Sequence, residues 1–366
     1  MKKLMTLVFA AGMMVSVASL MFTSCTKEGP QGPAGPAGHD GTDANATCTQ
    51  CHNWSDSLVT KVFQYDASQH ATGSTTFEGT RTDCAPCHAS QGFVECLTTG
   101  SFKTAAPYYD AAPINCRTCH NIHKTYSSSD WALATVTPFR ARYDSTVTID
   151  LAAKGGSSNL CGRCHQARPA SPGLSNPTST TDSVKITSYR WGPHHGTQAL
   201  FLAGKGAFEI GAVPFGQTTA HKDGASCSTC HQALAQGDLV GGHTLKMANV
   251  EGGSPVENFI ACKTCHSSAT SFDINGKQTE IAGLFNTLKV KLAAANVLDT
   301  VVTSSHYMLL KGNISSTSPK YFKQKQLSVY WNFQMVFADR SEGVHNYMYT
   351  HDMLQSGIDY MVSIGY

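Results

Sequence analysis

The sequence predicts a mainly α-helical fold with extensive loops and a helical C-terminal cap. Three observations predict it. A five-residue motif that needs one helical turn occurs six times between residues 48 and 266. The segments between these motifs are rich in Gly, Ser, Thr and Pro and carry few periodic stretches, which is typical of loops. From about residue 276 onwards apolar residues recur at helical spacing, and the motif no longer occurs.

Residues 1–24 are interpreted as a lipoprotein signal peptide. Two lysines precede an almost uncharged apolar run from Leu4 to Met21, and Phe22-Thr23-Ser24-Cys25 follows. This arrangement resembles a bacterial lipoprotein signal, in which the Cys becomes the lipidated first residue. A retained membrane helix and ordinary secretory cleavage are the alternatives. We expect lipidation of Cys25, and because Thr26-Lys27 lacks the Asp that commonly retains lipoproteins at the inner membrane, an outer-membrane location.

Residues 25–44 contain the lipidated Cys and a collagen-like stalk. Glycine falls at every third position through five triplets, from Gly29 to Asp43. This pattern either forms an extended, polar spacer of polyproline character or trimerises the chain. We favour the spacer, because five triplets are short for a stable triple helix. A homo-oligomer formed through this Gly-x-y stalk is the alternative. His39 lies inside the stalk and is not expected to bind a metal.

The region 45–271 holds the six Cys-x-x-Cys-His motifs, which are typical of covalent c-type haem attachment. Two thiols on one helical turn can reach the two vinyl groups of one porphyrin, and the adjacent His ligates the iron. Zinc knuckles and a thioredoxin-like dithiol are excluded, because six copies all carry His directly after the second Cys. The sequence therefore predicts six c-type haems. They are attached at Cys48/Cys51, Cys84/Cys87, Cys116/Cys119, Cys161/Cys164, Cys227/Cys230 and Cys262/Cys265, with proximal ligands His52, His88, His120, His165, His231 and His266.

The composition agrees with a fold that depends on its cofactor. The chain has 27 basic and 25 acidic residues, only 14% of its residues are charged, and no basic run indicates a nucleic-acid partner. With 41% hydrophobic residues the polypeptide alone would make a poor core for its length, so porphyrins should supply the missing apolar surface. The motifs use 12 of the 14 cysteines, which leaves Cys25 and Cys96. Cys96 has apolar neighbours and is predicted to be a small buried thiol.

Two further segments, the long gap between the fourth and fifth motifs and the C-terminal region, differ in their apolar spacing. The long gap from Arg168 to Ala225 has room for a small β-hairpin. In residues 272–366 apolar spacing predicts helices over about 281–292, 327–337 and 346–363, with a break at 339–344. This region is predicted to be a helical cap on the last haems.

The second axial ligand decides what each iron can do. A second His gives a closed, low-potential electron carrier, Met raises the potential, and an empty position allows chemistry. Ligation of one iron by Met247 or Met335 is an alternative to His. The chain has 16 histidines, and those outside the motifs are His39, His70, His123, His194, His195, His221, His243, His306, His345 and His351.

Several short stretches resemble large bacterial multihaem c-type cytochromes. They are Ser68 to Ala71 with Cys84 to Phe93, Trp191 to Gly196, Gly242 to Thr244, and Gly343 to Asn346. In that family a His upstream of one motif serves another haem, and the helical C-terminus supplies one more distal ligand. The resemblance implies a multihaem cytochrome c fold wrapped around a haem chain. It also implies distal roles for His70, His123, His194, His221, His243 and His345, with His195 as the alternative to His194.

The roles of two further histidines are predicted from their spacing in the sequence. His123 follows its motif by three residues and should serve a neighbouring haem. His351 falls on the same helical face as Tyr347, Leu354 and Ile358 and is expected to be a packed core residue.

These features predict a membrane-anchored hexahaem cytochrome that transfers electrons in the bacterial cell envelope. Its partners would be redox proteins of the envelope or extracellular electron acceptors. One alternative is a multihaem oxidoreductase acting on nitrite, hydroxylamine or sulfur oxyanions, and another is a subunit of an extracellular cytochrome filament. We favour the carrier over an enzyme, because every motif keeps its His and enough distal candidates are present.

Overall fold

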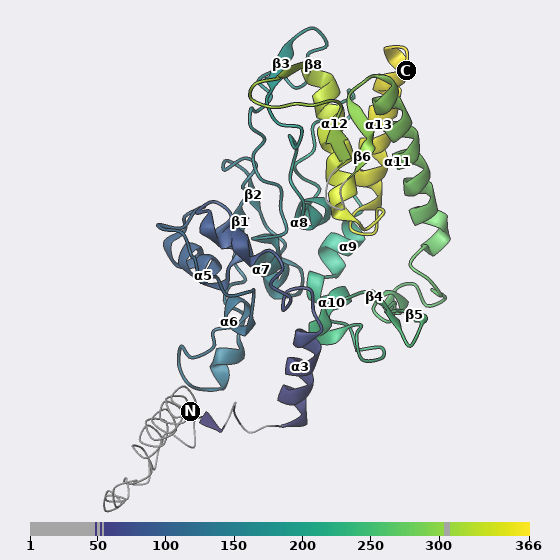
Figure 1. Ribbon diagram of the computed structural model, residues 1–366. Helices are drawn as coiled ribbons and strands as arrows, with labels where there is room; N and C mark the ends of the chain where they lie inside the picture. The colour runs from purple at the N-terminus through teal and green to yellow at the C-terminus, as the bar shows by residue number, and fades with distance from the viewer. Residues whose placement is uncertain (1–47, 50–51, 53–54, 304–307) are drawn as a thin grey trace, which may run out of the picture. The chain divides into compact units, whose positions relative to one another are not determined.

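The computed structural model describes residues 48–49, 52, 55–303 and 308–366 (Figure 1). The predicted signal peptide, Cys25, the stalk with His39, Cys51 and His306 lie outside these residues. By its contacts the chain divides into residues 1–46 and 47–366, and the description below concerns the second unit. None of the helices in the described part is long and apolar enough to cross a bilayer.

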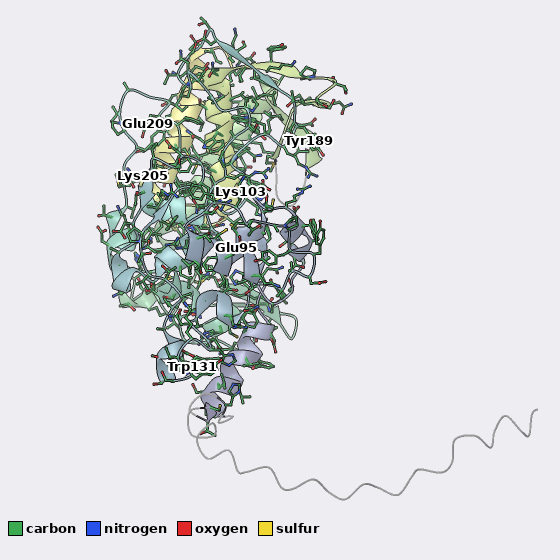
Figure 2. The ribbon with its side chains drawn as sticks, turned by 90° about the vertical axis from the view of Figure 1, so that its left-hand side faces the viewer. Glu95, Lys103, Trp131, Tyr189, Lys205 and Glu209 are labelled. Atoms are coloured by element: carbon green, nitrogen blue, oxygen red, sulfur yellow. The ribbon has the colours of Figure 1, made fainter. Side chains whose placement is uncertain are left out.

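Short helices separated by loops form the first part of this unit. Ser55 caps the first of them by accepting a hydrogen bond from the backbone N–H of Leu58. Glu95, labelled in Figure 2, accepts hydrogen bonds from the backbone N–H of Ala105 and the hydroxyl of Tyr108, and so ties its helix to the following loop. The helices are α3 (Asp56–Asp66), α4 (Ala85–His88), α5 (Ser90–Thr99) and α6 (Cys116–Cys119).

The middle of the unit continues in the same way. Four of the haem motifs contribute to short α-helices, as predicted, and the sixth motif begins a 3-10 helix. The helices are α7 (Ser158–Gly162), α8 (Gln198–Ala203), α9 (Thr219–Gly224) and α10 (Cys227–His231). The 3-10 turns are Thr76–Thr80, Ser128–Trp131, Ala153–Gly156, Gly242–Thr244, Cys262–Thr264 and Ile274–Gly276.

Strands are short and pair two by two, always antiparallel. The small β-hairpin for which the gap from residue 168 to residue 225 has room does not form in this described part of the chain. The strand in that gap, β3, pairs instead with β8, with Ser183 opposite Lys323 and Ile186 opposite Lys320. This pairing buries Ile186 completely and Phe322 almost completely, which a local hairpin on the loop surface would not do. The pairs are β1 (Phe139–Arg140) with β2 (Thr148–Ile149), β3 (Ser183–Ile186) with β8 (Lys320–Lys323), β4 (Ala248–Glu251) with β5 (Ser254–Glu257), and β6 (Leu298–Thr303) with β7 (Met308–Leu310).

The three C-terminal helices predicted from apolar spacing are confirmed. They are α11 (Lys277–Ala294), α12 (Gln324–Asp339) and α13 (Tyr347–Ser363), and all three pack against one another (Figure 1). Gly357 makes this close packing possible, because a Cβ there would lie 3.0 Å from a methyl carbon of Leu288. Phe285 of α11 stacks on Phe333 of α12, with ring centres 4.3 Å apart. The cap is not purely helical, however, since β6, β7 and β8 also belong to residues 272–366.

The apolar core combines these helices with residues 139–215. Trp191 packs against Tyr330 and Trp331 of α12, and the hydroxyl of Thr197 donates to the backbone carbonyl of Met335. Tyr330 and Phe333 are fully buried. The core therefore draws on segments from both sides of residue 272.

Candidate cofactor-binding site

One cavity of about 2950 Å³ runs past five of the six motifs. Shared among five porphyrins, this volume gives about 590 Å³ each, which is within the roughly 300–1,000 Å³ of ordinary cofactor pockets. Its wall includes the cysteines of those five motifs and eleven histidines. They are the motif residues His88, His120, His165, His231 and His266, and the distal candidates His70, His194, His195, His221, His243 and His345.

The charge on the cavity wall also suits haem. Each haem carries two propionate groups, which need cationic partners or water. Nine basic residues line the cavity against the three acidic residues Asp83, Asp339 and Glu342. The basic residues are Lys61, Lys103, Arg142, Lys154, Arg168, Arg190, Lys246, Lys277 and Arg340.

Every motif histidine faces a second histidine. The ring centres of these pairs are 6.1 to 6.5 Å apart. The partners come from loops or helix ends far from the motif in sequence. The pairs are His52 with His123 (6.2 Å), His165 with His70 (6.1 Å), His120 with His243 (6.4 Å), His231 with His345 (6.4 Å), His266 with His221 (6.4 Å), and His88 with both His195 (6.1 Å) and His194 (6.5 Å).

This separation is the one that a shared metal ion requires. A first-row metal ion lies about 2.0–2.1 Å from an imidazole nitrogen. That nitrogen lies roughly 1.1 Å from the centre of its five-membered ring, given ring bonds of about 1.33 Å. One iron between two imidazoles would therefore set the ring centres about 6.3 Å apart. The donor set, two imidazoles and two thiols for each of six sites, fits c-type haem.

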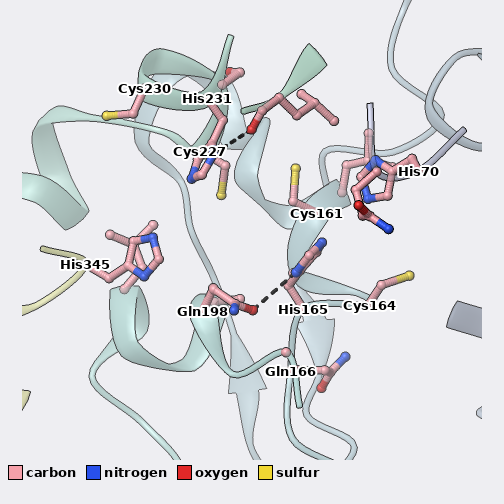
Figure 3. Close-up of a pocket in the computed structure, with 18 of the residues that line it drawn as sticks. His70, Cys161, Cys164, His165, Gln166, Gln198, Cys227, Cys230, His231 and His345 are labelled. Carbon is pink, nitrogen blue, oxygen red and sulfur yellow. Dashed lines mark hydrogen bonds between the residues drawn. The ribbon is translucent and has the colours of Figure 1, made fainter. Parts of the chain in front are cut away.

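Hydrogen bonds at Nδ1 orient several of these imidazoles. When Nδ1–H donates to an oxygen, the other ring nitrogen, Nε2, is left to bind metal. Figure 3 shows His165 hydrogen-bonded to the side chain of Gln198, with His231 and His345 nearby. The Nδ1 partners are Trp131 O for His120 (2.6 Å), Leu245 O for His231 (3.0 Å), Gln198 Oε1 for His165 (3.2 Å), Thr75 Oγ1 for His88 (3.0 Å), Val344 O for His221 (2.6 Å) and Asp339 Oδ1 for His345 (2.7 Å).

Burial keeps several of the ligand histidines neutral. It lowers the pKa of His70 to about 4, and it also lowers the pKa of His88, His231 and His243. A neutral imidazole has a free nitrogen lone pair and can bind metal without first losing a proton. His345 differs. Burial again acts to lower its pKa, but the neighbouring Asp339 carboxylate outweighs burial and raises the pKa.

Capping residues explain why two of the motifs form helical turns. The side chain of Asn115 accepts a hydrogen bond from the backbone N–H of Arg117 at 3.0 Å, and the Thr118 hydroxyl oxygen accepts one from the backbone N–H of Asn115 at 3.0 Å. Ser226 and Thr229 form the same reciprocal cap in front of the fifth motif. Each cap satisfies free N–H groups at the first turn and so holds both cysteines of its motif on one turn.

Cysteines of neighbouring motifs also meet. The Sγ atom of Cys87 lies 3.9 Å from the carbonyl oxygen of Arg163, and the Sγ atom of Cys164 lies 3.7 Å from that of Pro86. On the other side of the fourth motif, the backbone N–H of Cys227 donates to the hydroxyl of Ser158 at 2.9 Å, and Ser158 lies in α7, the helix that carries Cys161. The fourth motif thus touches both the second and the fifth, and the porphyrins attached there would be neighbours.

The second motif faces two histidines instead of one. One ring nitrogen each from His88, His194 and His195 lie within 4.8 Å of one another. The rings of His194 and His195 are 3.8 Å apart. The backbone makes a tight turn here, since His194 (φ 72°) and Gly196 (φ 88°) are both left-handed. This turn places the imidazoles of His194 and His195 next to His88. The choice between His194 and His195 stays open.

Other predicted residues lie elsewhere. His52 and His123 are exposed, and neither belongs to the cavity wall. Met247 lines the cavity, whereas Met335 is fully buried in the apolar core. His351 is not a packed core residue: its side chain is 31% exposed and contacts the carboxylates of Asp352 and Glu280.

Cys96 is half-buried, where a buried thiol was expected. Its helix, α5, turns only one face to the protein, so that Phe93 is buried while Val94 is 40% exposed. Burial raises the pKa of the Cys96 thiol.

Sequence reasoning missed the groups that orient the ligands. Trp131, labelled in Figure 2, and Leu245 and Val344 act through backbone carbonyls, which leave no mark in a sequence. Asp339 and Gln198 act through side chains, but nothing in their local pattern distinguishes them from ordinary polar residues.

A family comparison points to the same chemistry. Residues 213–282 match the family described as cytochrome c7 and related cytochrome c. This stretch contains the fifth and sixth motifs together with His221 and His243. No curated protein matches the chain. Among solved structures it is similar to the crystal structure of the outer cell wall cytochrome OcwA, with a TM-score of 0.47 and 19% identity over 81% of this chain and 49% of that one. The chain thus spans about half the length of that structure. The family match and the motifs support a multihaem c-type cytochrome that binds c-type haem.

Proposed function

We propose that this chain is a hexahaem c-type cytochrome lipoprotein that carries electrons in the cell envelope through haems with two histidine ligands each. The observation that carries the proposal is the pairing of every motif histidine with a second histidine at 6.1 to 6.5 Å. Haem iron, when bound, alternates between the ferric and ferrous states and so supplies one-electron chemistry.

The residues of the chain divide this task. The motif cysteines would attach each porphyrin covalently, and the motif histidine would hold its iron. The second histidine would be the other ligand of that iron, so that no position would be open to a small substrate. Nδ1 hydrogen bonds such as those of His120 and His221 hold the imidazoles in place before and after a change of iron charge. This arrangement favours a carrier over an enzyme acting on nitrite, hydroxylamine or sulfur oxyanions.

The haem count tests this proposal. Intact mass spectrometry of the matured protein should give the processed, lipidated polypeptide plus six haem masses, one for each motif. A reductive titration should then take up six electrons per chain. Four haems or fewer on fully matured protein would contradict the assignment of every motif as occupied.

The location in the envelope rests on the N-terminal sequence. Lipidation of Cys25 would tether the chain to a membrane, with the outer membrane favoured, and residues 26–44 would serve as the spacer. From there the chain would exchange electrons with redox proteins of the envelope or with extracellular acceptors. Cys25→Ser should move the protein to the soluble fraction with its haems attached. If the variant stays membrane-bound after a salt wash, the apolar N-terminus is an uncleaved anchor instead.

A further inference from the structure

The hydrogen bonds that orient the ligand histidines differ in whether the acceptor group is charged or neutral. Of the six Nδ1 bonds seen within the described residues, five go to neutral oxygens, which are three backbone carbonyls, one amide and one hydroxyl. The sixth, from His345, goes to the carboxylate of Asp339 at 2.7 Å. The two residues also form an ion pair when His345 is protonated. His345 is the partner of the motif residue His231.

Asp339 is well placed to keep its charge near the ring. It is the last residue of α12, and its side chain is only 2% exposed, so water screens it little. Its second carboxylate oxygen accepts a hydrogen bond from the Ser341 hydroxyl. Its backbone carbonyl accepts a bond from the side-chain amide of Gln198 at 3.3 Å. These contacts hold the carboxylate against the imidazole and away from solvent.

A carboxylate at Nδ1 acts on the metal through the ring. It draws the Nδ1 proton towards itself and so makes the imidazole a more basic, more electron-donating ligand. Such a ligand stabilises the ferric state over the ferrous state and lowers the reduction potential. A neutral carbonyl or amide oxygen does the same more weakly, because hydrogen bonds to ionised acceptors are roughly twice as strong.

We propose that Asp339 is a tuning residue that gives the site between His231 and His345 the lowest reduction potential of the five sites in the cavity. The proposal rests on the proposed function, since it presumes that these histidines bind haem iron.

The site between His231 and His345 belongs to the fifth motif, whose place among the other motifs affects the order in which the haems would be reduced. The fifth motif contacts α7, the helix of the fourth motif, because the backbone N–H of Cys227 donates to the hydroxyl of Ser158 at 2.9 Å. It also lines the same cavity as the sixth motif, which follows it in the sequence. The lowest potential would therefore fall inside the row of motifs, and electrons would collect on both sides of this site first.

The test is a redox titration of the full-length holoprotein carrying Asp339→Asn, followed by visible spectroscopy. Asparagine keeps the size and a hydrogen-bond acceptor but removes the charge. We expect the lowest-potential step to rise by at least about tenfold in its equilibrium constant, which is about 59 mV for one electron. Haem mass and the low-spin spectrum should stay unchanged. Asp352→Asn is the matched control, because Asp352 contacts Nδ1 of His351, a residue outside the cavity wall. This control should leave the lowest step in place.

A second variant keeps the test decisive if Asp339→Asn does not mature. Ser341→Ala keeps the carboxylate but removes the hydroxyl that shares its charge, so the lowest step should move in the opposite direction, downwards. A rise or no change in Ser341→Ala would overturn the proposal.

The remaining outcomes are equally clear. An unmoved lowest step in Asp339→Asn with six low-spin haems would overturn the proposal. So would one high-spin iron in that variant, because Asp339 would then position His345 and not tune it. If the unmodified protein lacked six low-spin haems, the proposed function itself would fail, and this is seen before any variant is made.

Discussion

The apolar core and the haem cavity are built on different principles. In the core, the helices α11 to α13 pack with residues 139–215, and Leu288, Phe333 and Met353 are completely buried. Around the cavity, α9 and α10 bury none of their residues, although α10 carries the fifth motif. The core holds itself together by side-chain packing. The cavity wall combines imidazoles, thiols and cations with apolar side chains such as Val62 and Phe272, which porphyrins would cover when they fill the space.

This difference teaches where the chain depends on its cofactor. The low charge and moderate hydrophobicity are averages over the whole sequence, and they do not show that one region is a packed core and the other a cofactor cavity. One region is packed by protein side chains, and the other contributes haem ligands and is completed by its cofactor.

The largest expected effect is the loss of structure without haem. In cells that cannot attach haem, α9 and α10 should lose their amide protection, whereas α11 to α13 should keep it because their partners are protein side chains. Hydrogen exchange followed by mass spectrometry measures this, with the holoprotein as control. Equal loss of protection in both regions would show that the core also depends on haem.

A single ligand change should affect one site and leave the core intact. His345→Ala should open one iron, which gives a high-spin fraction of about one in six in the absorption and paramagnetic resonance spectra. His345→Met should instead keep that iron low-spin and raise its potential. His351→Ala is the control. His351 lies in α13, a short distance along the chain from His345 but outside the cavity wall, so its replacement should leave the haem spectrum unchanged. If His345→Ala leaves the spectrum unchanged, His345 is structural and the distal ligand must be sought at another residue, such as His306.

A core change should do the reverse, lowering stability without changing the haem spectrum. Leu288 of α11 is fully buried next to Gly357 of α13, so Leu288→Ala should cost about 2–5 kcal/mol in the free energy of unfolding. Val290, on the same helix, is 68% exposed, and Val290→Ala should cost less than about 0.5 kcal/mol. Thermal or denaturant unfolding of the holoprotein compares the two. Equal costs for both variants would contradict the packing of this core.

The smallest effects are expected at the second motif. His194→Ala and His195→Ala should each keep all irons low-spin, because either imidazole is at ligand distance from His88. The double replacement should open one iron. If one of the single variants already gives a high-spin iron, that residue is the dedicated ligand and the other is structural.

The sequence predicted local features well and distant contacts poorly. The Cys-x-x-Cys-His turns and the three C-terminal helices follow from spacing within one segment, and capping residues such as Asn115 reinforce them. The pairing of β3 with β8 could not be predicted, because it joins segments far apart in the chain. Asp339 could not be assigned either, since its role depends on a buried contact with His345. The histidine partners implied by the family resemblance remain predictions until a ligand-state measurement is made.

The central claim is that each of the six irons lies between two histidines. Near-infrared magnetic circular dichroism of the fully oxidised holoprotein, together with its paramagnetic resonance spectrum, measures the ligand state of every iron. We predict six low-spin irons per chain with two imidazole ligands each, and no reaction with cyanide or nitrite. A high-spin iron in the unmodified protein that binds either anion readily would contradict the account and favour an enzyme.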